Sequence, residues 1–264
     1  MAGAGLVVPS PPQLLSAKRH GALGWHGPSD TEAVTALSSV PIGAREAAAV
    51  ATSLPIGIFG SDVRGLHLRA ILGDSGRAVW SLSELRYTPF ALRFYPFSAL
   101  RTQDSETDKL QWRLALHEDA DCVHPKGHPL FDDAGKPKEA TLKITKLFEA
   151  ACADYSLGHL MCVHLMKTSV LSKAKAPAPA CLTVNSQALH QLSGAALESL
   201  HRNGALRLAH SIETSNLHLS RLKGAETPAT PAEPPPQSSP EAQSDFLDAV
   251  ISDISVEPAF QTES

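Results

Sequence analysis

The sequence predicts an α+β fold, in which a small, mostly antiparallel sheet is packed by C-terminal helices. Over residues 36–120, short apolar stretches alternate with turn residues, a pattern typical of strands. From about residue 138, apolar residues recur at steps of three and four, which favours helices. Hydrophobic residues make up 43% and charged residues 19% of the 264, values that are ordinary for a folded chain. That length accommodates one large or two small domains.

The strand region contains one hairpin signal and two further strand-like stretches. Leu66–Leu72 partly alternates, and the turn residues Gly73–Gly76 follow before apolar residues resume, which predicts a hairpin. Leu92–Phe97 is also strand-like, but Pro96 within it favours an edge strand or a bulge, because proline cannot donate to the ladder. Gln111–Leu116 alternates and predicts another strand.

The helical region begins with one long element. Its periodicity predicts a helix from about Lys138 to about Met166, with a possible break near Gly158. Two more helices are predicted over Leu189–Leu200 and Ala205–Leu222. Between them, Asn203-Gly204 is a typical helix stop.

Composition divides the chain into four parts. Residues 1–30 are rich in Gly, Pro and Ala and are predicted to be a flexible arm, and residues 31–223 form the folded domain. Residues 224–244 contain six prolines and no aromatic residue, so we expect a disordered Pro-rich linker that cannot bury enough apolar surface to order itself. Residues 245–264 form a short acidic amphipathic segment.

The C-terminal segment has the pattern of a docking peptide. Its apolar residues fall on one helical face: Phe246, Leu247, Val250, Ile251 and Ile254. Eight of the 27 acidic residues follow Lys223, whereas no Lys or Arg does. A short helix at the end of a tether suits a protein partner. An uncleaved export signal is the alternative.

Several classes of protein are disfavoured. Residues 1–223 carry a net charge of +4, which is too weak to argue for nucleic-acid binding. No run approaches the roughly 18 apolar residues of a membrane span. The apolar run Leu6–Val8 is short and followed by prolines, so no Sec signal is expected and the predicted location is cytoplasmic. Export to the cell surface by a non-Sec route is the alternative. The four cysteines include no CxxC pair.

A polar stretch after Leu116 offers two weak metal hypotheses. His117 and Asp119 have the His-x-Asp spacing of an iron-binding facial triad. The second histidine would have to come from His164, His201, His210 or His218. Alternatively, Cys122, His124 and His128 could contribute to a zinc site. Since both patterns are short, we favour a polar turn and expect no metal or cofactor.

Two other clusters are interpreted as core. One face of the predicted long helix carries Cys152, Tyr155, His159 and Cys162. An aromatic run is either a ligand-stacking platform or, as we favour, an anchor between strands and helices: Phe90, Phe94, Tyr95 and Phe97. No GxSxG, Walker-type or GxGxxG motif is present, so nothing indicates a nucleotide or a hydrolytic reaction.

Several motifs together resemble one bacterial family. Arg86–Phe90 followed by Arg93–Phe97 is similar to the arginine–aromatic–Pro-Phe signature of SapC-family proteins, and Pro129–Pro137 resembles that family's Leu-Phe-Asp-x-x-Gly-x-Pro turn. Val40-Pro41-Ile42, Glu46 and Leu54-Pro55-Ile56 match upstream elements, and the resemblance covers about residues 36–222. The motif residues are Arg93, Tyr95, Pro96, Phe97, Leu130, Phe131, Asp132, Gly135 and Pro137.

The resemblance implies an accessory or interaction protein linked to the bacterial surface layer or to envelope uptake, without catalytic activity of its own. Members also tend to be encoded near oxygenases and halogenases, so a metal-dependent enzyme or enzyme subunit of such a pathway is the alternative. The family supplies no catalytic residues. It commonly has an acidic residue where His117 stands, which argues against the iron site. The turn motif also has a structural interpretation, because Asp132 can bind backbone N–H groups and Gly135 allows positive φ.

Overall fold

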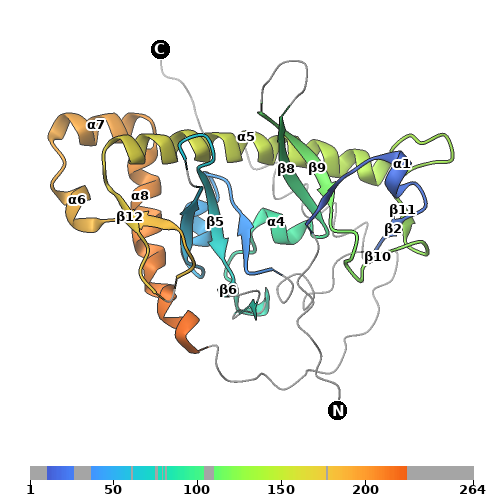
Figure 1. Ribbon diagram of the computed structural model, residues 1–264, viewed down its shortest axis with the longest axis horizontal. Coiled ribbons are helices and arrows are strands. Elements are labelled where there is room, and N and C mark those ends of the chain that lie inside the picture. Colours follow the sequence, from blue (N-terminus) through green and yellow to red (C-terminus); the bar gives the residue numbers. More distant parts are fainter. Residues whose placement is uncertain are drawn as a thin grey trace. The chain divides into compact units, whose positions relative to one another are not determined.

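The computed structural model confirms the α+β class, and every strand pair it describes is antiparallel (Figure 1). It describes residues 11–26, 37–60, 62–74, 77, 78, 80, 82–103, 110–176 and 178–224. These residues all belong to the compact unit Met1–Pro228, and the second unit, Ala229–Ser264, lies outside them.

The largest sheet has five strands in the order β12-β13-β4-β5-β3. Their bounds are Leu171–Lys173 for β12, Leu182–Val184 for β13, Ile56–Phe59 for β4, His67–Ile71 for β5 and Ser39–Pro41 for β3. In β5, Leu68 and Ala70 are buried while His67 and Arg69 face the other side, as the alternation in the sequence predicts. This alternation brings two polar side chains to one face near the β3 edge.

The described residues also form a second sheet and two small ones. The order of the second sheet is β1-β9-β8, formed by Gln13–Leu14, Leu110–Leu116 and Phe97–Gln103. In the third, β2 (Gly24–Trp25) lies between β10 (Val123–His124) and β11 (His128–Pro129). A hairpin lies at the predicted place, but with other strands: β6 (Gly73–Asp74) pairs with β7 (Arg77–Ala78). The predicted first strand, Leu66–Leu72, contains β5, which pairs with β3 and β4 instead.

The helices follow the predicted order with changed boundaries. The long helix is α5, Glu139–Lys167, and it continues through Gly158. A Cβ at that position would lie 3.1 Å from Leu68 Cδ1, so the glycine allows close contact with β5. The predicted helix over 189–200 is divided, because Asn185 and Ser193 each cap a separate helix. The remaining C-terminal elements are α6 (Ser186–His190), α7 (Gly194–Arg202), α8 (Ala205–Ser215) and the 3₁₀ helix η2 (Asn216–Gly224).

The strand predicted over Leu92–Phe97 was wrong. Residues Phe90–Arg93 form the short helix α4, and β8 begins only at Phe97. The helix forms because Phe90 and Phe94, one turn apart, both pack against Phe148 of α5, with ring centroids 5.3 and 6.0 Å away. This contact supports the interpretation of Phe90 and Phe94 as an anchor between the strand region and the helices.

The prediction of a flexible arm over residues 1–30 was wrong for residues 11–26. They form β1, the short helix α1 (Ala17–His20) and β2, and β1 pairs with the edge of β9. Trp25 is buried and its ring meets that of Phe97 edge to face at 5.1 Å. The strands in this segment are only two residues long and pair with residues about a hundred positions away. Such pairing leaves no local periodicity in the sequence.

The long helix α5 joins the two larger sheets, since it contacts both β5 and β9 (Figure 1). Two more short elements are α3 (Ala47–Val50), between β3 and β4, and the 3₁₀ turn η1 (Leu82–Glu84), between β7 and α4. The strands β3 and β5 and the strands β8 and β9 both line one cavity, and Ala91 of α4 lines it as well.

Candidate ligand pocket

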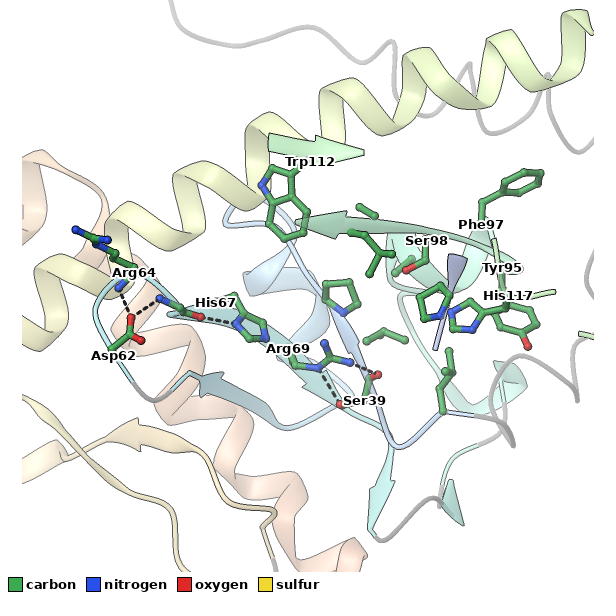
Figure 2. A pocket seen from close by; sticks show the side chains of 18 residues that line it. Ser39, Asp62, Arg64, His67, Arg69, Tyr95, Phe97, Ser98, Trp112 and His117 are labelled. Atoms are coloured by element: carbon green, nitrogen blue, oxygen red, sulfur yellow. Dashed lines mark hydrogen bonds between the residues drawn. The ribbon is translucent and has the colours of Figure 1, made fainter. Parts of the chain in front are cut away.

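This cavity of about 590 Å³ lies between these two pairs of strands (Figure 2). That volume is in the range of pockets that bind small molecules. One wall comes from β3, β5 and the loop before β5, and the other from β8, β9 and the end of α4. The residues labelled in Figure 2 are Ser39, Asp62, Arg64, His67, Arg69, Tyr95, Phe97, Ser98, Trp112 and His117.

Arg69 is the most strongly held polar group of the first wall. Its Nε donates to Ser39 Oγ at 2.9 Å and its Nη2 donates to the Ser39 carbonyl at 2.7 Å, across the β3–β5 pairing. The guanidinium also lies over the ring of Phe59, 5.9 Å from its centroid. Burial lowers the pKa of Arg69. The side chain is thus a positioned, largely desolvated cation.

The loop before β5 is fixed by its own turn. The Asp62 carboxylate accepts the backbone N–H groups of Arg64 and Gly65 at 2.8 and 2.9 Å. The Nδ1 of His67 lies 2.7 Å from the Gly65 carbonyl. These contacts set the position of His67 beside Arg69 (Figure 2).

The opposite wall is mainly aromatic. Trp112 of β9 packs against Tyr155 of α5, with ring centroids 5.5 Å apart. Tyr95 and His117 face each other at 5.3 Å, and the backbone N–H of His117 donates to the Pro96 carbonyl at 2.9 Å. Flat apolar faces opposite a cation suit a ligand that has both an apolar and a charged part.

A buried hydrogen-bond network holds α4 beneath this wall. Glu46 accepts from Gly43 N at 2.9 Å, from Phe90 N at 3.0 Å and from the Tyr87 hydroxyl at 3.1 Å. Arg93 Nη2 in turn donates to the Tyr87 hydroxyl at 2.8 Å. Burial raises the pKa of Glu46, and burial together with the neighbouring Glu46 raises the pKa of Tyr87 to about 12.

A family model named SapC matches residues 15–222. The chain belongs to the SapC family. No curated protein and no solved structure matches it. The match begins between β1 and α1, so it includes α1 and the pocket residues from Leu37 to His117.

Two residues of the first SapC motif line the pocket. Arg93 binds Tyr87 and lies over its ring, 5.2 Å from the centroid. Tyr95 lines the cavity, Pro96 follows it through a cis peptide bond, and Phe97 begins β8. Each interpretation of the aromatic run therefore applies to part of it. Phe90 and Phe94 anchor the strand region to α5, whereas Tyr95 and Phe97 line the pocket.

The second SapC motif, Pro129–Pro137, forms the expected turn. Asp132 Oδ1 accepts the Lys136 N–H at 2.8 Å, and Gly135 has φ of +76°. Pro137 bridges to Phe131 just before α5. Leu130 and Phe131 are buried, which gives this motif a structural role at the start of the long helix.

The predicted metal ligands do not assemble into a site. Among the described residues, no three His, Cys, Asp or Glu side chains are arranged to hold a metal ion. His117 lines the pocket, but Asp119 is exposed. The rings of His124 and His128 lie 4.5 and 6.2 Å from that of His26.

The predicted helix face of α5 is buried in part. Burial raises the pKa of Cys162 to about 12 and that of Cys152 to about 11, so both are protonated thiols at neutral pH. Tyr155 is buried, and His159 Nδ1 lies 2.8 Å from the Leu66 carbonyl. The core interpretation fits these contacts.

The predicted partner-binding residues Phe246, Leu247, Val250, Ile251 and Ile254 lie outside the described residues. Within the described part of the chain, no helix is long and apolar enough to cross a membrane. Arg69 and Trp112 were not predicted as site residues. The alternation of β5 places His67 and Arg69 on one face of the strand. The pairing with β3, which makes this face a pocket wall, is not visible in the local sequence.

Proposed function

We propose that this SapC-family chain is an accessory binding protein without catalytic activity of its own, and that it holds a small molecule in the pocket between β3–β5 and β8–β9. The observation that carries the proposal is the pocket itself, with a positioned arginine on one wall and aromatic rings on the other. The family's link to the surface layer or envelope uptake gives such a binding protein a place to act.

The walls are held in place by strand pairing, and the loop before β5 is held by the hydrogen bonds of Asp62, which supports a binding site. Arg69 is held through two hydrogen bonds to Ser39 of the neighbouring strand. Phe97 is locked against Trp25, and Trp112 against Tyr155. A ligand would therefore enter a preformed site and pay little ordering entropy.

A pocket-filling variant tests the proposal. Ser98 lines the cavity from β8, so Ser98→Phe would occupy it, whereas Ser199→Phe adds the same ring to an exposed position on α7. We expect the neutral probe 2-naphthamide, the anionic probe 2-naphthoate or both to bind the wild-type chain with one site in isothermal titration calorimetry. The S98F variant loses this binding and S199F keeps it.

Equal binding by S98F and S199F, at unchanged thermal unfolding midpoints, would overturn the assignment of the pocket as the binding site. Absence of any saturable binding by the wild-type chain to both probes would do the same.

The second part of the proposal is a protein partner for the acidic C-terminal segment. Val250 belongs to the apolar stripe of that segment, and Ser252 belongs to its polar side. We expect Val250→Asp in the full chain to abolish capture of an envelope or uptake protein from the native cells, and Ser252→Asp to leave it intact. Equal capture by both variants, read by mass spectrometry, would place the partner surface elsewhere.

A further inference from the structure

We infer that the ligand of this pocket is a small organic carboxylate, whose carboxylate pairs with Arg69 while its flat apolar body lies against Trp112 and Tyr95. The inference rests on the proposed function, since it assigns the chemical class of the molecule that the pocket holds. It follows from three observations: Arg69 has no counter-ion among the described residues, part of its guanidinium is left for a ligand, and the opposite wall is mainly aromatic and apolar.

The hydrogen bonds of Arg69 go to neutral groups. Among the residues that the structure describes, no Asp or Glu forms an ion pair with it, and its hydrogen-bond acceptors are the neutral hydroxyl and carbonyl of Ser39. Burial lowers its pKa, which means that the charged form is poorly solvated. A desolvated cation without a counter-ion is costly, and an anion entering the pocket would relieve that cost.

The guanidinium keeps one edge for this anion. It has five N–H donors in a planar fork. Ser39 takes the Nε and one Nη2 donor, which lie on the same side edge of the group. The three other N–H groups have no partner among the described residues, and they include the end edge formed by Nη1 and Nη2. Two parallel donors at that edge match the two oxygens of a carboxylate.

The other charges at the pocket do not neutralise Arg69. Asp62 is the acidic residue of the lining, and its carboxylate accepts the backbone N–H groups of Arg64 and Gly65 in its own turn. Arg64 adds a second positive charge at the pocket, and His67 and His117 also line it. The Asp62 carboxylate is engaged in its own turn, so Arg69 is the positioned cation that an anion in the cavity would meet.

The remaining lining selects for an apolar body. The wall opposite Arg69 contains Trp112, Tyr95 and Phe97 together with Ala99 and Leu100. Val40 of β3 adds an aliphatic side chain on the same wall as Arg69. These surfaces favour burial of a flat hydrocarbon ring, and the two-donor end edge of Arg69 matches the two oxygens of a carboxylate. A carboxylate attached to an aromatic or aliphatic ring meets both walls.

The experiment compares matched probes on matched variants. Titration calorimetry is carried out with 2-naphthoate, 2-naphthamide and 2-naphthyl phosphate on the full chain. We expect 2-naphthoate to bind at least tenfold more tightly than the amide, and the phosphate to bind no more tightly than the carboxylate. Arg69→Met removes the preference for the carboxylate and leaves the amide affinity within about threefold. Arg69→Lys, which keeps the charge but not the fork, gives an intermediate preference.

Arg64→Met is the matched control, because it removes a cation from the same pocket. We expect it to keep most of the preference for 2-naphthoate. Loss of the preference in R64M but not in R69M would overturn the role of Arg69.

If both probes bind the wild type equally and S98F abolishes both, the proposed pocket stands and the carboxylate assignment is wrong. Tighter binding of 2-naphthyl phosphate would replace the carboxylate by a phosphate. If R69M does not fold, as judged by circular dichroism, R69K decides.

Discussion

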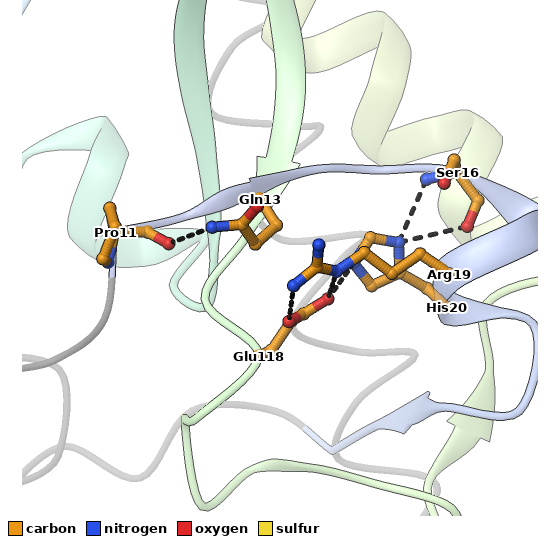
Figure 3. Close-up of polar contacts among 6 residues, drawn as sticks. All are labelled: Pro11, Gln13, Ser16, Arg19, His20 and Glu118. Atoms are coloured by element: carbon orange, nitrogen blue, oxygen red, sulfur yellow. Dashed lines mark hydrogen bonds and ion pairs between the residues drawn. The ribbon is translucent and has the colours of Figure 1, made fainter.

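Two glutamates of this domain hold distant segments together with both of their carboxylate oxygens, yet their surroundings are opposite. Glu46 accepts two backbone N–H groups and one hydroxyl inside the protein and joins the start of α3 to α4. Glu118 follows β9 at the surface and binds Arg19 through both oxygens, with Nη2 at 2.8 Å (Figure 3). It also lies 2.8 Å from Nε2 of the fully buried His20 and thereby holds α1.

The pKa values of the two groups move in opposite directions. Burial is the largest influence on Glu46, and it raises the pKa despite three donors. For Glu118, the hydrogen bonds and charge of Arg19 lower the pKa, and desolvation is a smaller effect. Neutral donors therefore do not fully replace water around a buried carboxylate. An exposed carboxylate with a cationic partner has its charged form stabilised at a smaller desolvation cost.

The largest expected difference between the two sites is the effect of Glu→Gln on stability. In Glu46→Gln, the amide NH₂ must face a backbone N–H in either orientation, because Oε1 binds Gly43 N and Oε2 binds Phe90 N. A buried donor then stays unsatisfied, at a cost of about 1–3 kcal/mol. Glu118→Gln meets a similar conflict with Arg19, but the exposed arginine can turn to water, so we expect a loss below about 1 kcal/mol.

Urea unfolding of the two variants at neutral pH measures this difference. Equal losses of unfolding free energy in E46Q and E118Q would show that the solvent exposure of the hydrogen-bond donors does not determine the loss of stability. A loss in E118Q above that in E46Q would instead make the attachment of α1 the more important of the two contacts.

The same two sites show what the sequence could and could not predict. Glu46, Tyr87 and Arg93 stood in the motifs that resemble SapC, so their importance was visible although their mutual contacts were not. The α+β class and the extent of α5 followed from periodicity. Arg19 was assigned to a flexible arm, because its partner Glu118 is 99 residues away and no local pattern records such a contact. Arg69 was missed for the same reason: alternation placed it on a strand face, but only the tertiary pairing of β3 with β5 makes that face a pocket wall.

The two carboxylates are also expected to change the stability with pH in opposite directions, an effect smaller than that of the substitutions. Because the folded-state pKa of Glu46 is raised, the folded chain binds a proton more readily than the unfolded chain between the ordinary value of 4.5 and the raised value. The contribution of Glu46 to stability is therefore present below the ordinary value and is lost as pH rises through the folded value. For Glu118 the folded pKa is lowered, so its contribution is present above 4.5 and is lost as pH falls through the folded value.

Unfolding free energies of the wild type, E46Q and E118Q across the acidic range test these opposite signs. The advantage of the wild type over E46Q should grow as pH falls from neutral toward the ordinary glutamate value, since protonation removes a poorly solvated charge. The advantage over E118Q should shrink as pH falls below that value, and by less than for Glu46, because the Arg19 pair is exposed and screened by solvent. If the two stability differences changed in the same direction with pH, the opposite pKa shifts of Glu46 and Glu118 would be contradicted.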